Sequence, residues 1–388
     1  MKKALFIVHN LKIGGVQKIT VGLARNHALL GNDVHILCLE KGKFIDVDFN
    51  CQIHTLDLMG FLLRRPLLAI YYALYKIVLR HIFPESEFFF SRPIFKPQIL
   101  NVLKEFESKG KFDAIFIRGS RAIKRTWWLN RKEAISSIHL PYRLSTQTKG
   151  VIGRYNYWLT SCLFKDKAIF TVSEYIASAL RESLSIQNVT PKSLCVINNP
   201  CDIERVKYLS EQKVKLLDAP YILGVGRLTK QKRFDVLIRA YHQAEIKNYK
   251  LVILGEGNQR GELEKLIAEL NLTDLVLMPG FVTNPYPWYK NAKLFVLSSD
   301  FEGFVNVITE ALACGTPVVS TDCGPAHEIL KGRFGLGITP KGEHIPLANK
   351  INDYLVEPVL PTYADIEWLS FKTIISQQMA IIDSQDIH

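Results

Sequence analysis

The segment Asp300–Leu330 constrains the fold more than any other part of the chain, because acidic groups, glycines and a helix start are concentrated in it. Just before it, Lys293–Ser299 is an apolar, β-prone run that predicts a buried strand. Within it, Asn306–Cys314 predicts a helix that stops at Gly315, and Thr316–Thr321 predicts the next strand. The order strand, loop, helix, strand is the building unit of a parallel α/β sheet.

Such a unit places its loop and helix N-terminus at the carboxyl edge of the sheet, where ligands of open α/β folds bind. Backbone N–H groups at the helix start, with the helix dipole behind them, would attract a phosphate. These groups belong to Phe304, Val305, Asn306 and Val307. Glu302 and Glu310 lie in the same unit. Since a carboxylate does not help to bind phosphate, we expect both to accept hydrogen bonds from hydroxyl groups, as acids do with ribose in dinucleotide sites.

The run EGFVNVITE from Glu302 to Glu310, continued by ALACGTPVV, resembles the E-x7-E signature of retaining glycosyltransferases of the GT-B fold, family 4. The resemblance implies an α/β protein with two Rossmann-like domains, whose parallel sheets face a central cleft. It also implies that Glu302 approaches the donor sugar and that Glu310 binds the ribose of the nucleotide. A solvated surface helix is the alternative interpretation of the two glutamates.

A second loop supports the resemblance. The strand Tyr221–Gly226 leads into RLTKQK, so that Arg227 and Lys232 lie at a strand-to-helix turn, where two cations can converge on a diphosphate. The match to the family's G-R-L…K loop implies that both hold the donor diphosphate, beside Gly226. The resemblance also implies that backbone at Gly280, Phe281 and Val282 holds the base.

Two features of the first half fit the same family. Gly14 and Gly15 follow the predicted strand Ala4–His9 and let backbone approach a ligand closely, although they lack the G-x-G-x-x-G of a dinucleotide site. In the family such a pair lines the cleft near donor phosphate or acceptor. His139 ends the short strand Ala134–His139 and matches a family histidine that faces the donor sugar. A plain turn and a structural histidine are the respective alternatives.

The expected domain boundaries follow from these motifs. Residues 1–205 form the acceptor-binding domain, residues 206–365 form the donor-binding domain, and residues 366–388 cross back to the first domain as a helix. The seven cysteines show no CxxC pair and no metal-ligand spacing, which fits a reducing cytoplasm.

Charge separates the two halves. Residues 1–200 hold 29 Lys and Arg against 14 Asp and Glu, whereas residues 201–388 hold 20 against 23. An anionic partner for the first half is therefore expected. The segment Arg118–Lys132 has six bases, two tryptophans and no acid, but no nucleic-acid-binding motif accompanies it. We expect acceptor or membrane contact there and no nucleic acid, with a solvated basic face as the alternative.

The segment Phe61–Phe83 has the length of a membrane span but contains five charged or proline positions, so a continuous apolar run is absent. Helical spacing puts Leu68, Tyr72, Tyr75 and Leu79 on one stripe. The helix either lies in a bilayer interface or faces the core with its cations extended to water. The following segment, Glu85–Ile99, is rich in Pro and Phe and predicts loops before a helix that ends near Ser108.

The expected function is transfer of a sugar from a nucleotide-sugar, with UDP as the expected nucleotide, to a hydroxyl of a glycan or lipid-linked acceptor in bacterial polysaccharide or lipopolysaccharide synthesis. Retention follows from the family, which is thought to use a front-face route. No DxD metal motif is evident, since Asp46–Asp48 (DVD) falls in an expected surface loop, so neither a metal nor another cofactor is expected. The expected location is the cytoplasm, on the inner face of the membrane. A GT-B epimerase or phosphorylase, and a non-catalytic membrane- or nucleic-acid-binding protein, are the alternatives.

Overall fold

The computed structural model describes residues 1–12, 14–42, 45, 47–82, 86–142, 147–246 and 248–384. Asp46, Phe83 and residues 385–388, which belong to segments discussed above, lie outside the described residues. The chain divides into two compact units. Unit 1 comprises Met1–Asn198 and Phe371–His388, and unit 2 comprises Asn199–Ser370.

These limits place residues 199–205 and 366–370 in unit 2, whereas the sequence analysis assigned both segments to the first domain. The grouping has a structural cause. The Cys201 N–H donates to the Leu369 carbonyl at 2.8 Å, and Cys201 pairs with Ser370 as an isolated parallel bridge. The helix α9 (Ile203–Ser210) packs on two other helices of unit 2.

Unit 1 is built on a seven-stranded sheet in the order β3-β2-β1-β4-β5-β6-β7, and every pair is parallel. The central strand β4 and its neighbour β1 are buried along their whole lengths, as expected for strands covered on both faces. The strands are β1 (Lys3–Val8), β2 (Asp33–Cys38), β3 (Gln52–Thr55), β4 (Ala114–Arg118), β5 (Ala134–Ile138), β6 (Ala168–Thr171) and β7 (Ser193–Val196).

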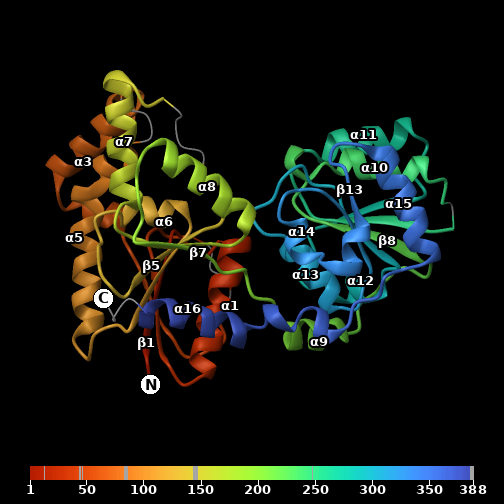
Figure 1. Ribbon diagram of the computed structural model, residues 1–388, viewed down its shortest axis with the longest axis horizontal. Coiled ribbons are helices and arrows are strands. Elements are labelled where there is room, and N and C mark those ends of the chain that lie inside the picture. Colours follow the sequence, from red (N-terminus) through yellow and green to blue (C-terminus); the bar gives the residue numbers. More distant parts are fainter. Residues whose placement is uncertain are drawn as a thin grey trace. The chain divides into compact units, whose positions relative to one another are not determined.

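Helices cover both faces of this sheet. α1 (Gly15–Leu29) and the last helix, α16 (Phe371–Ser384), share one hydrophobic core with the strands and lie side by side in Figure 1, red and blue, although they come from opposite ends of the chain. On the other face, Phe106 of α5 packs on His35 of β2 with ring centroids 4.6 Å apart. Four further helices of this unit are α5 (Glu87–Glu107), α6 (Ser120–Arg125), α7 (Gly150–Phe164) and α8 (Glu174–Ile186).

The helix α5 corrects the sequence analysis, which predicted loops over Glu85–Ile99 and therefore over the first 13 of its 21 residues. It runs through Pro93 and Pro97 without interruption. A proline inside a helix removes a backbone bond and disfavours helix by about 3 kcal/mol. Two observations explain why the helix persists: its apolar residues are buried along its whole length, and side chains of other elements bond carbonyls of its first turn. Trp127 donates to the Phe88 carbonyl, and Tyr71 donates to the Phe90 carbonyl.

The segment between residues 58 and 82 is a broken helix rather than one long helix. It consists of α2 (Leu58–Leu63), α3 (Pro66–Leu74), a π-helical turn (Tyr75–Leu79) and α4 (Arg80–Ile82). The stripe predicted from helical spacing is the inward one: Tyr75 is 2% exposed and stacks on Phe90 of α5 at 5.5 Å. Among the described residues no helix is long and apolar enough to cross a membrane.

Unit 2 is built on a six-stranded parallel sheet in the order β10-β9-β8-β11-β12-β13. Figure 1 shows helices α10, α11 and α15 on one side of this sheet and α12 and α13 on the other. The strands are β8 (Tyr221–Val225), β9 (Lys250–Leu254), β10 (Val276–Gly280), β11 (Leu294–Leu297), β12 (Val318–Thr321) and β13 (Ile338–Thr339).

The helices of unit 2 alternate with these strands, as the sequence predicted. One hydrophobic core joins the strands to α10, α11 and α15. The helices are α10 (Phe234–Gln243), α11 (Arg260–Glu269), α12 (Tyr286–Asn291), α13 (Asn306–Ala313), α14 (Ala326–Ile329) and α15 (His344–Val356). Short 3-10 turns lie at Lys230–Lys232, Gly332–Gly337, Tyr363–Asp365 and Glu367–Leu369.

A buried histidine in unit 1 predicts that acid destabilises this unit. His27 is 1% exposed and lies 5.6 Å from the rings of Phe6 and Phe116, and burial lowers its pKa to about 4. An unfolded histidine titrates near pH 6.5, so the unfolded state binds the proton first as the pH falls from 6.5 to 4. The free energy of unfolding should therefore fall by up to about 3 kcal/mol across this window.

Urea unfolding of unit 1, followed at pH 7 and at pH 4.5, measures this effect. The variant His27→Leu should lose part of the pH dependence, whereas His242→Leu, at an exposed position in unit 2, should keep it. An unchanged pH dependence in His27→Leu would show that His27 is not the group responsible.

Candidate active site

The expected donor-binding residues of unit 2 lie on loops that leave one edge of its sheet. The loops after β10, β9, β8 and β11 emerge side by side because these strands are neighbours in that order. The loop after β8 carries Arg227 and Lys232, the loop after β11 carries Glu302, and Gly280 is the last residue of β10. The parallel direction of the strands places all of these loops at the carboxyl edge, where ligands bind in open α/β sheets.

Two glycines that the sequence analysis did not assign to the site allow the loop after β9 to lie against the loop after β8. Gly255 has a φ of +143°, and a side-chain Cβ there would lie 1.8 Å from the Gly226 carbonyl oxygen. A Cβ at Gly257 would lie 2.2 Å from the Leu228 carbonyl oxygen. The backbones are close because the Leu228 N–H donates to the Glu256 carbonyl at 2.9 Å. The sequence G-E-G directly after a predicted strand could have indicated this close approach of two backbones.

The central contact of the site joins Lys232 to Glu302. Lys232 Nζ lies 2.6 Å from Glu302 Oε1, and the two side chains are 14% and 11% exposed. The sequence analysis assigned Lys232 to the diphosphate and Glu302 to the sugar, and the structure brings these two residues into direct contact. An ion pair so far removed from water is strong only while both partners are present, because the loss of one leaves an unpaired buried charge.

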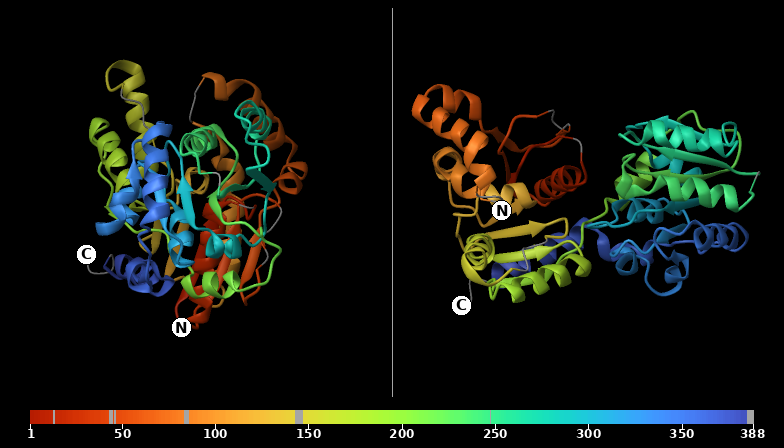
Figure 2. Two further views of the ribbon diagram at one scale, coloured as in Figure 1. Left: turned by 90° about the vertical axis from the view of Figure 1, so that its right-hand side faces the viewer. Right: turned by 90° about the horizontal axis from the view of Figure 1, so that it is seen from above.

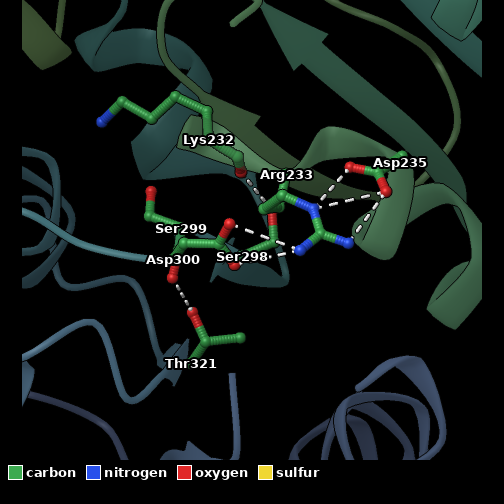
Figure 3. A network of polar contacts seen from close by, with 7 residues as sticks. All are labelled: Lys232, Arg233, Asp235, Ser298, Ser299, Asp300 and Thr321. Atoms are coloured by element: carbon green, nitrogen blue, oxygen red, sulfur yellow. Dashed lines mark hydrogen bonds and ion pairs between the residues drawn. The ribbon is translucent and has the colours of Figure 1, made fainter. Parts of the chain in front are cut away.

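Arg233 fixes the backbone on which Lys232 lies, as Figure 3 shows. Its guanidinium lies between two carboxylates, with 3.1 Å from Nε to Asp235 Oδ1 and 3.1 Å from Nη1 to Asp300 Oδ1. Hydrogen bonding to Asp235 raises the pKa of Arg233. Its φ of +48° is unusual for a residue with a side chain, so the bridge holds a backbone conformation that is otherwise disfavoured.

Hydrogen bonds then join this loop to the one after β11. The Ser298 hydroxyl donates to the Lys232 carbonyl at 2.8 Å, and the Asp300 N–H donates to the Gln231 carbonyl at 2.9 Å. Gln231 Nε2 in turn donates to the Phe301 carbonyl at 2.7 Å. The two loops are therefore one rigid backbone unit. Sequence reasoning missed the bridging role of Arg233, since its partner Asp300 lies 67 residues away.

The buried thiol beside Glu302 is chemically quiet. The Glu302 N–H donates to the Cys323 carbonyl at 3.1 Å. Burial, together with the Glu302 carboxylate, raises the pKa of the Cys323 thiol to about 12. Because the thiolate is the reactive form, Cys323 serves the site as packing.

Glu310 lies on α13, within the predicted helix. It is 9% exposed, and the Tyr286 hydroxyl of α12 approaches its Oε1 at 3.5 Å. Burial and the Glu310 carboxylate raise the pKa of Tyr289 well above its usual value. The tyrosines were not foreseen, because nothing in the sequence of α12 marks them as neighbours of an acid 24 residues further on.

The helix start that was expected to bind phosphate has the predicted position. Phe304 and Val305 are 7% and 1% exposed, and Val305 is the N-cap of α13 without a side-chain cap. Asn306 Oδ1 accepts a bond from Asn199 Nδ2 at 3.3 Å, so that side chain has a structural contact within unit 2. Val307, the next residue, is half-buried.

The residues expected to hold base and diphosphate differ in exposure. Gly280 has a φ of +93°, and its carbonyl accepts from the Gly255 N–H at 2.8 Å, which places the two loops together. Phe281 is 59% exposed, and Val282 is half-buried. Arg227 is exposed, and its side chain makes no hydrogen bond or ion pair to a described residue.

In unit 1, His139 follows β5 at the carboxyl edge of that sheet. It is 8% exposed, and its Nε2 lies 2.9 Å from the Ser137 hydroxyl. The same Ser137 hydroxyl also lies 3.3 Å from the Ile117 carbonyl. Burial and the nearby Arg118 lower the pKa of His139 far below its usual value, so the ring is neutral.

Gly14 and Gly15 lie at the start of α1. Gly14 is the N-cap without a side-chain hydrogen bond, and the first turn contains no acid. The positive end of the helix therefore faces the carboxyl edge with no carboxylate of its own turn against it.

Comparison with known proteins decides the family. The model for glycosyl transferases group 1 matches residues 207–367, and the model for glycosyltransferase family 4 matches residues 13–205. The N-acetylgalactosamine-N,N'-diacetylbacillosaminyl-diphospho-undecaprenol 4-alpha-N-acetylgalactosaminyltransferase of Campylobacter jejuni is 31% identical over 356 residues, 89% of this chain and 88% of that protein. This chain belongs to the group 1, family 4 glycosyltransferases.

Two further comparisons bear on the glycosyltransferase. A lipopolysaccharide core biosynthesis glycosyltransferase, LpsE of Rhizobium meliloti, is 35% identical over 147 residues, 37% of this chain and 43% of that protein. The crystal structure of Anabaena HepE in complex with UDP and glucose superposes with a TM-score of 0.63 at 19% identity, covering 99% of this chain and 95% of that chain. The two parallel-sheet units and this match confirm the GT-B fold.

The Arg233 bridge predicts a separation of activity from stability in the glycosyltransferase. The substitution Arg233→Lys keeps the positive charge and a side chain at this positive-φ position. Lysine cannot bond Asp235 and Asp300 together, because it lacks the planar fork of arginine. We expect kcat/KM to fall at least about tenfold because Lys232 loses its fixed position. The free energy of unfolding should change by no more than about 1 kcal/mol, since Arg233 is 29% exposed.

Steady-state kinetics and thermal unfolding of the same preparations measure the two effects. Arg333→Lys is the matched control, because that arginine also bonds a carboxylate, Asp365, outside these loops. Full activity in Arg233→Lys, or an equal loss in both variants, would contradict a positioning role for the bridge.

Proposed function

We propose that the glycosyltransferase moves a sugar from a UDP-sugar to a hydroxyl of a lipid-linked or lipopolysaccharide acceptor, with the anomeric configuration retained. The contact between Lys232 and Glu302 carries this proposal. It places a cation suited to phosphate against a carboxylate suited to sugar hydroxyls, at the carboxyl edge of a parallel sheet. The names of the Campylobacter and Rhizobium relatives support the acceptor class, and the HepE complex supports UDP.

The proposed reaction needs no protein nucleophile. In the front-face route implied by the family, the acceptor hydroxyl attacks the anomeric carbon on the side from which UDP departs, and its proton passes to the departing phosphate oxygen. Arg227, Lys232 and the backbone N–H groups from Phe304 to Val307 would stabilise the negative charge that develops on that phosphate. Glu302 and the neutral ring of His139 would accept hydrogen bonds from sugar hydroxyls.

We propose that these cations take the place of a metal ion. Among the described residues, no group of three or more His, Cys, Asp or Glu side chains is arranged to hold a metal. Arg227 and Lys232 supply positive charge at the diphosphate instead. Activity should therefore persist in EDTA.

A thermal-shift panel with UDP, GDP, ADP and CMP, each with and without EDTA, tests the donor site. A nucleotide at about 100 times its dissociation constant adds about 2.7 kcal/mol to the stability of the state that binds it. We expect UDP alone to give this shift, with EDTA without effect. Glu310→Ala should abolish it, and Glu262→Ala, on the exposed face of α11, should not.

With a UDP-sugar and a lipid-linked acceptor, proton NMR of the product should show the anomeric configuration of the donor. An inverted product, or strict dependence on added Mg²⁺ or Mn²⁺, would overturn the proposed chemistry. A product that is an epimerised nucleotide-sugar would favour the epimerase alternative.

We also propose that unit 1 binds the anionic inner face of the cytoplasmic membrane through α2, α3 and the π-helical turn. These elements expose an apolar stripe at spacings of four and three residues, on the side opposite to Tyr75. The right-hand view of Figure 2 shows them, in orange, at the margin of their unit. The exposed fractions are 78% for Leu63, 81% for Leu67, 66% for Ile70, 49% for Leu74 and 71% for Ile77.

Basic residues border this stripe. The Arg65 guanidinium lies 4.1 Å from the centroid of the Phe61 ring, and Lys76 lies over Tyr72 at 5.4 Å. Apolar side chains beside cations with aromatic neighbours are typical of helices that lie in the bilayer interface. Each cation near an anionic surface adds about 1 kcal/mol. The core-facing alternative thus applies to one side of the helix, and the membrane proposal applies to the other.

The triple substitution Leu67→Ser, Ile70→Ser, Leu74→Ser should abolish flotation with vesicles that contain anionic lipid. The melting temperature should change little, because these side chains are exposed already. Val356→Ser, which removes a side chain 87% exposed in unit 2, is the control. Undiminished flotation of the triple variant would assign membrane binding to another surface.

A further inference from the structure

The strongest unexplained feature of unit 1 is a buried arginine with no acidic partner. Arg118, the last residue of β4, is 2% exposed. No carboxylate among the described residues forms an ion pair with it, and its Nη2 is buried without a hydrogen-bond partner. Burial lowers its pKa to about 9, so it remains charged at neutral pH. Arginine is rarely buried in this way unless it is paired.

The contacts that Arg118 does make are too weak to balance its charge. Its Nε donates to the Thr20 hydroxyl of α1 at 3.4 Å, the long end of hydrogen-bond distances. That hydroxyl is itself bonded to the Val16 carbonyl at 2.7 Å. The guanidinium carbon lies 5.6 Å from the Phe170 ring centroid, which is a modest cation–π contact. A charge held by these contacts alone is destabilising.

The position of Arg118 indicates that a ligand could balance its charge. It lies at the carboxyl end of its strand, the edge at which parallel sheets bind ligands. The next residue, Gly119, lies close to the first turn of α1, since a Cβ there would be 3.7 Å from Val16. Arg118 is also the neighbour of Ser137 in the sheet, two residues before His139. The guanidinium therefore contacts the second turn of α1, whose first turn contains no acid, and its charge acts on the neutral imidazole of His139.

We propose that Arg118 forms the base of an oxyanion subsite in unit 1 that takes a phosphate of the acceptor. The inference deepens the proposed function and rests on it for the identity of the acceptor. A guanidinium presents a planar fork of donors that matches phosphate oxygens. The unpartnered Nη2 is such a donor, and the Arg118 charge is the one that a phosphate would balance.

Inorganic pyrophosphate is the probe that tests the subsite in the full-length enzyme. Thermal unfolding is followed at increasing pyrophosphate and constant ionic strength, in the presence of saturating UDP so that the proposed donor site is filled. The variants are Arg118→Met, which is similar in size and apolar, and Arg118→Lys. Arg121→Met, which removes a nearby exposed cation, controls for general charge effects.

We expect pyrophosphate to raise the melting temperature of the wild type and of Arg121→Met but not of Arg118→Met. Without pyrophosphate, Arg118→Met should melt at least about 2 °C above the wild type, because an unbalanced buried charge has been removed. Its KM for the lipid-linked acceptor should rise at least tenfold with the KM for the donor unchanged. A merely structural arginine would give a lower melting temperature and an unchanged acceptor KM, which would overturn the proposal.

Two further outcomes would also overturn it: no pyrophosphate response in the wild type, or a response retained by a folded Arg118→Met. If Arg118→Met does not fold, Arg118→Lys decides, and a pyrophosphate response equal to that of the wild type rules the subsite out. The UDP shift, read separately, reports on the proposed function. Loss of that shift with an intact pyrophosphate response would contradict the donor assignment while leaving the subsite in place.

Discussion

The ion pair between Lys232 and Glu302 is the contact on which the loops at the carboxyl edge of unit 2 depend. Its partners come from the loops after β8 and β11, and both side chains are largely removed from water. In such surroundings the attraction between the charges is strong, but so is the penalty for separating them, of the order of 3–5 kcal/mol when one partner is removed. The two loops must therefore stay in register. The Arg233 bridge and the hydrogen bonds between the loops hold that register without using either charge of the pair.

Under the proposed function, the same pair takes part in binding the donor. A diphosphate that approaches Lys232 competes with Glu302 for one cation, and it brings more negative charge than the carboxylate that it displaces. Arg227, which is exposed and makes no ion pair with a described residue, can supply the additional positive charge. Glu302 then needs a new partner, and sugar hydroxyls are hydrogen-bond donors that a carboxylate accepts readily. In the proposed reaction, release of Lys232 and binding of the sugar by Glu302 would occur together, and this would link binding of the leaving group to orientation of the sugar.

The sequence predicted those parts of this arrangement that depend on local pattern. Apolar runs such as Ala4–His9 and Lys293–Ser299 identified strands, because strands covered on both faces must be continuously apolar. Lys232 and Glu302 were recognised from short motifs. Their contact was not predicted, because it joins positions 70 residues apart through the order of strands in the sheet. The partners of Arg233 and of Glu310 were not predicted either, because they too are distant in the sequence. The error at α5 has another origin, since burial outweighed the low helix propensity of Pro93 and Pro97.

The two units differ in whether a buried cation has a carboxylate partner. In unit 2 the buried cation of the site has its carboxylate within the unit. In unit 1, Arg118 has none among the described residues, and an apolar stripe from Leu63 to Ile77 is exposed to water. Both features lower stability, and neither improves the packing of the sheet. Natural proteins depart from the rules of stable packing mainly at functional sites. Unit 1 is the unit proposed to bind a phosphorylated lipid acceptor. Such a ligand would supply a phosphate to balance the charge of Arg118, and a membrane would bury the apolar stripe.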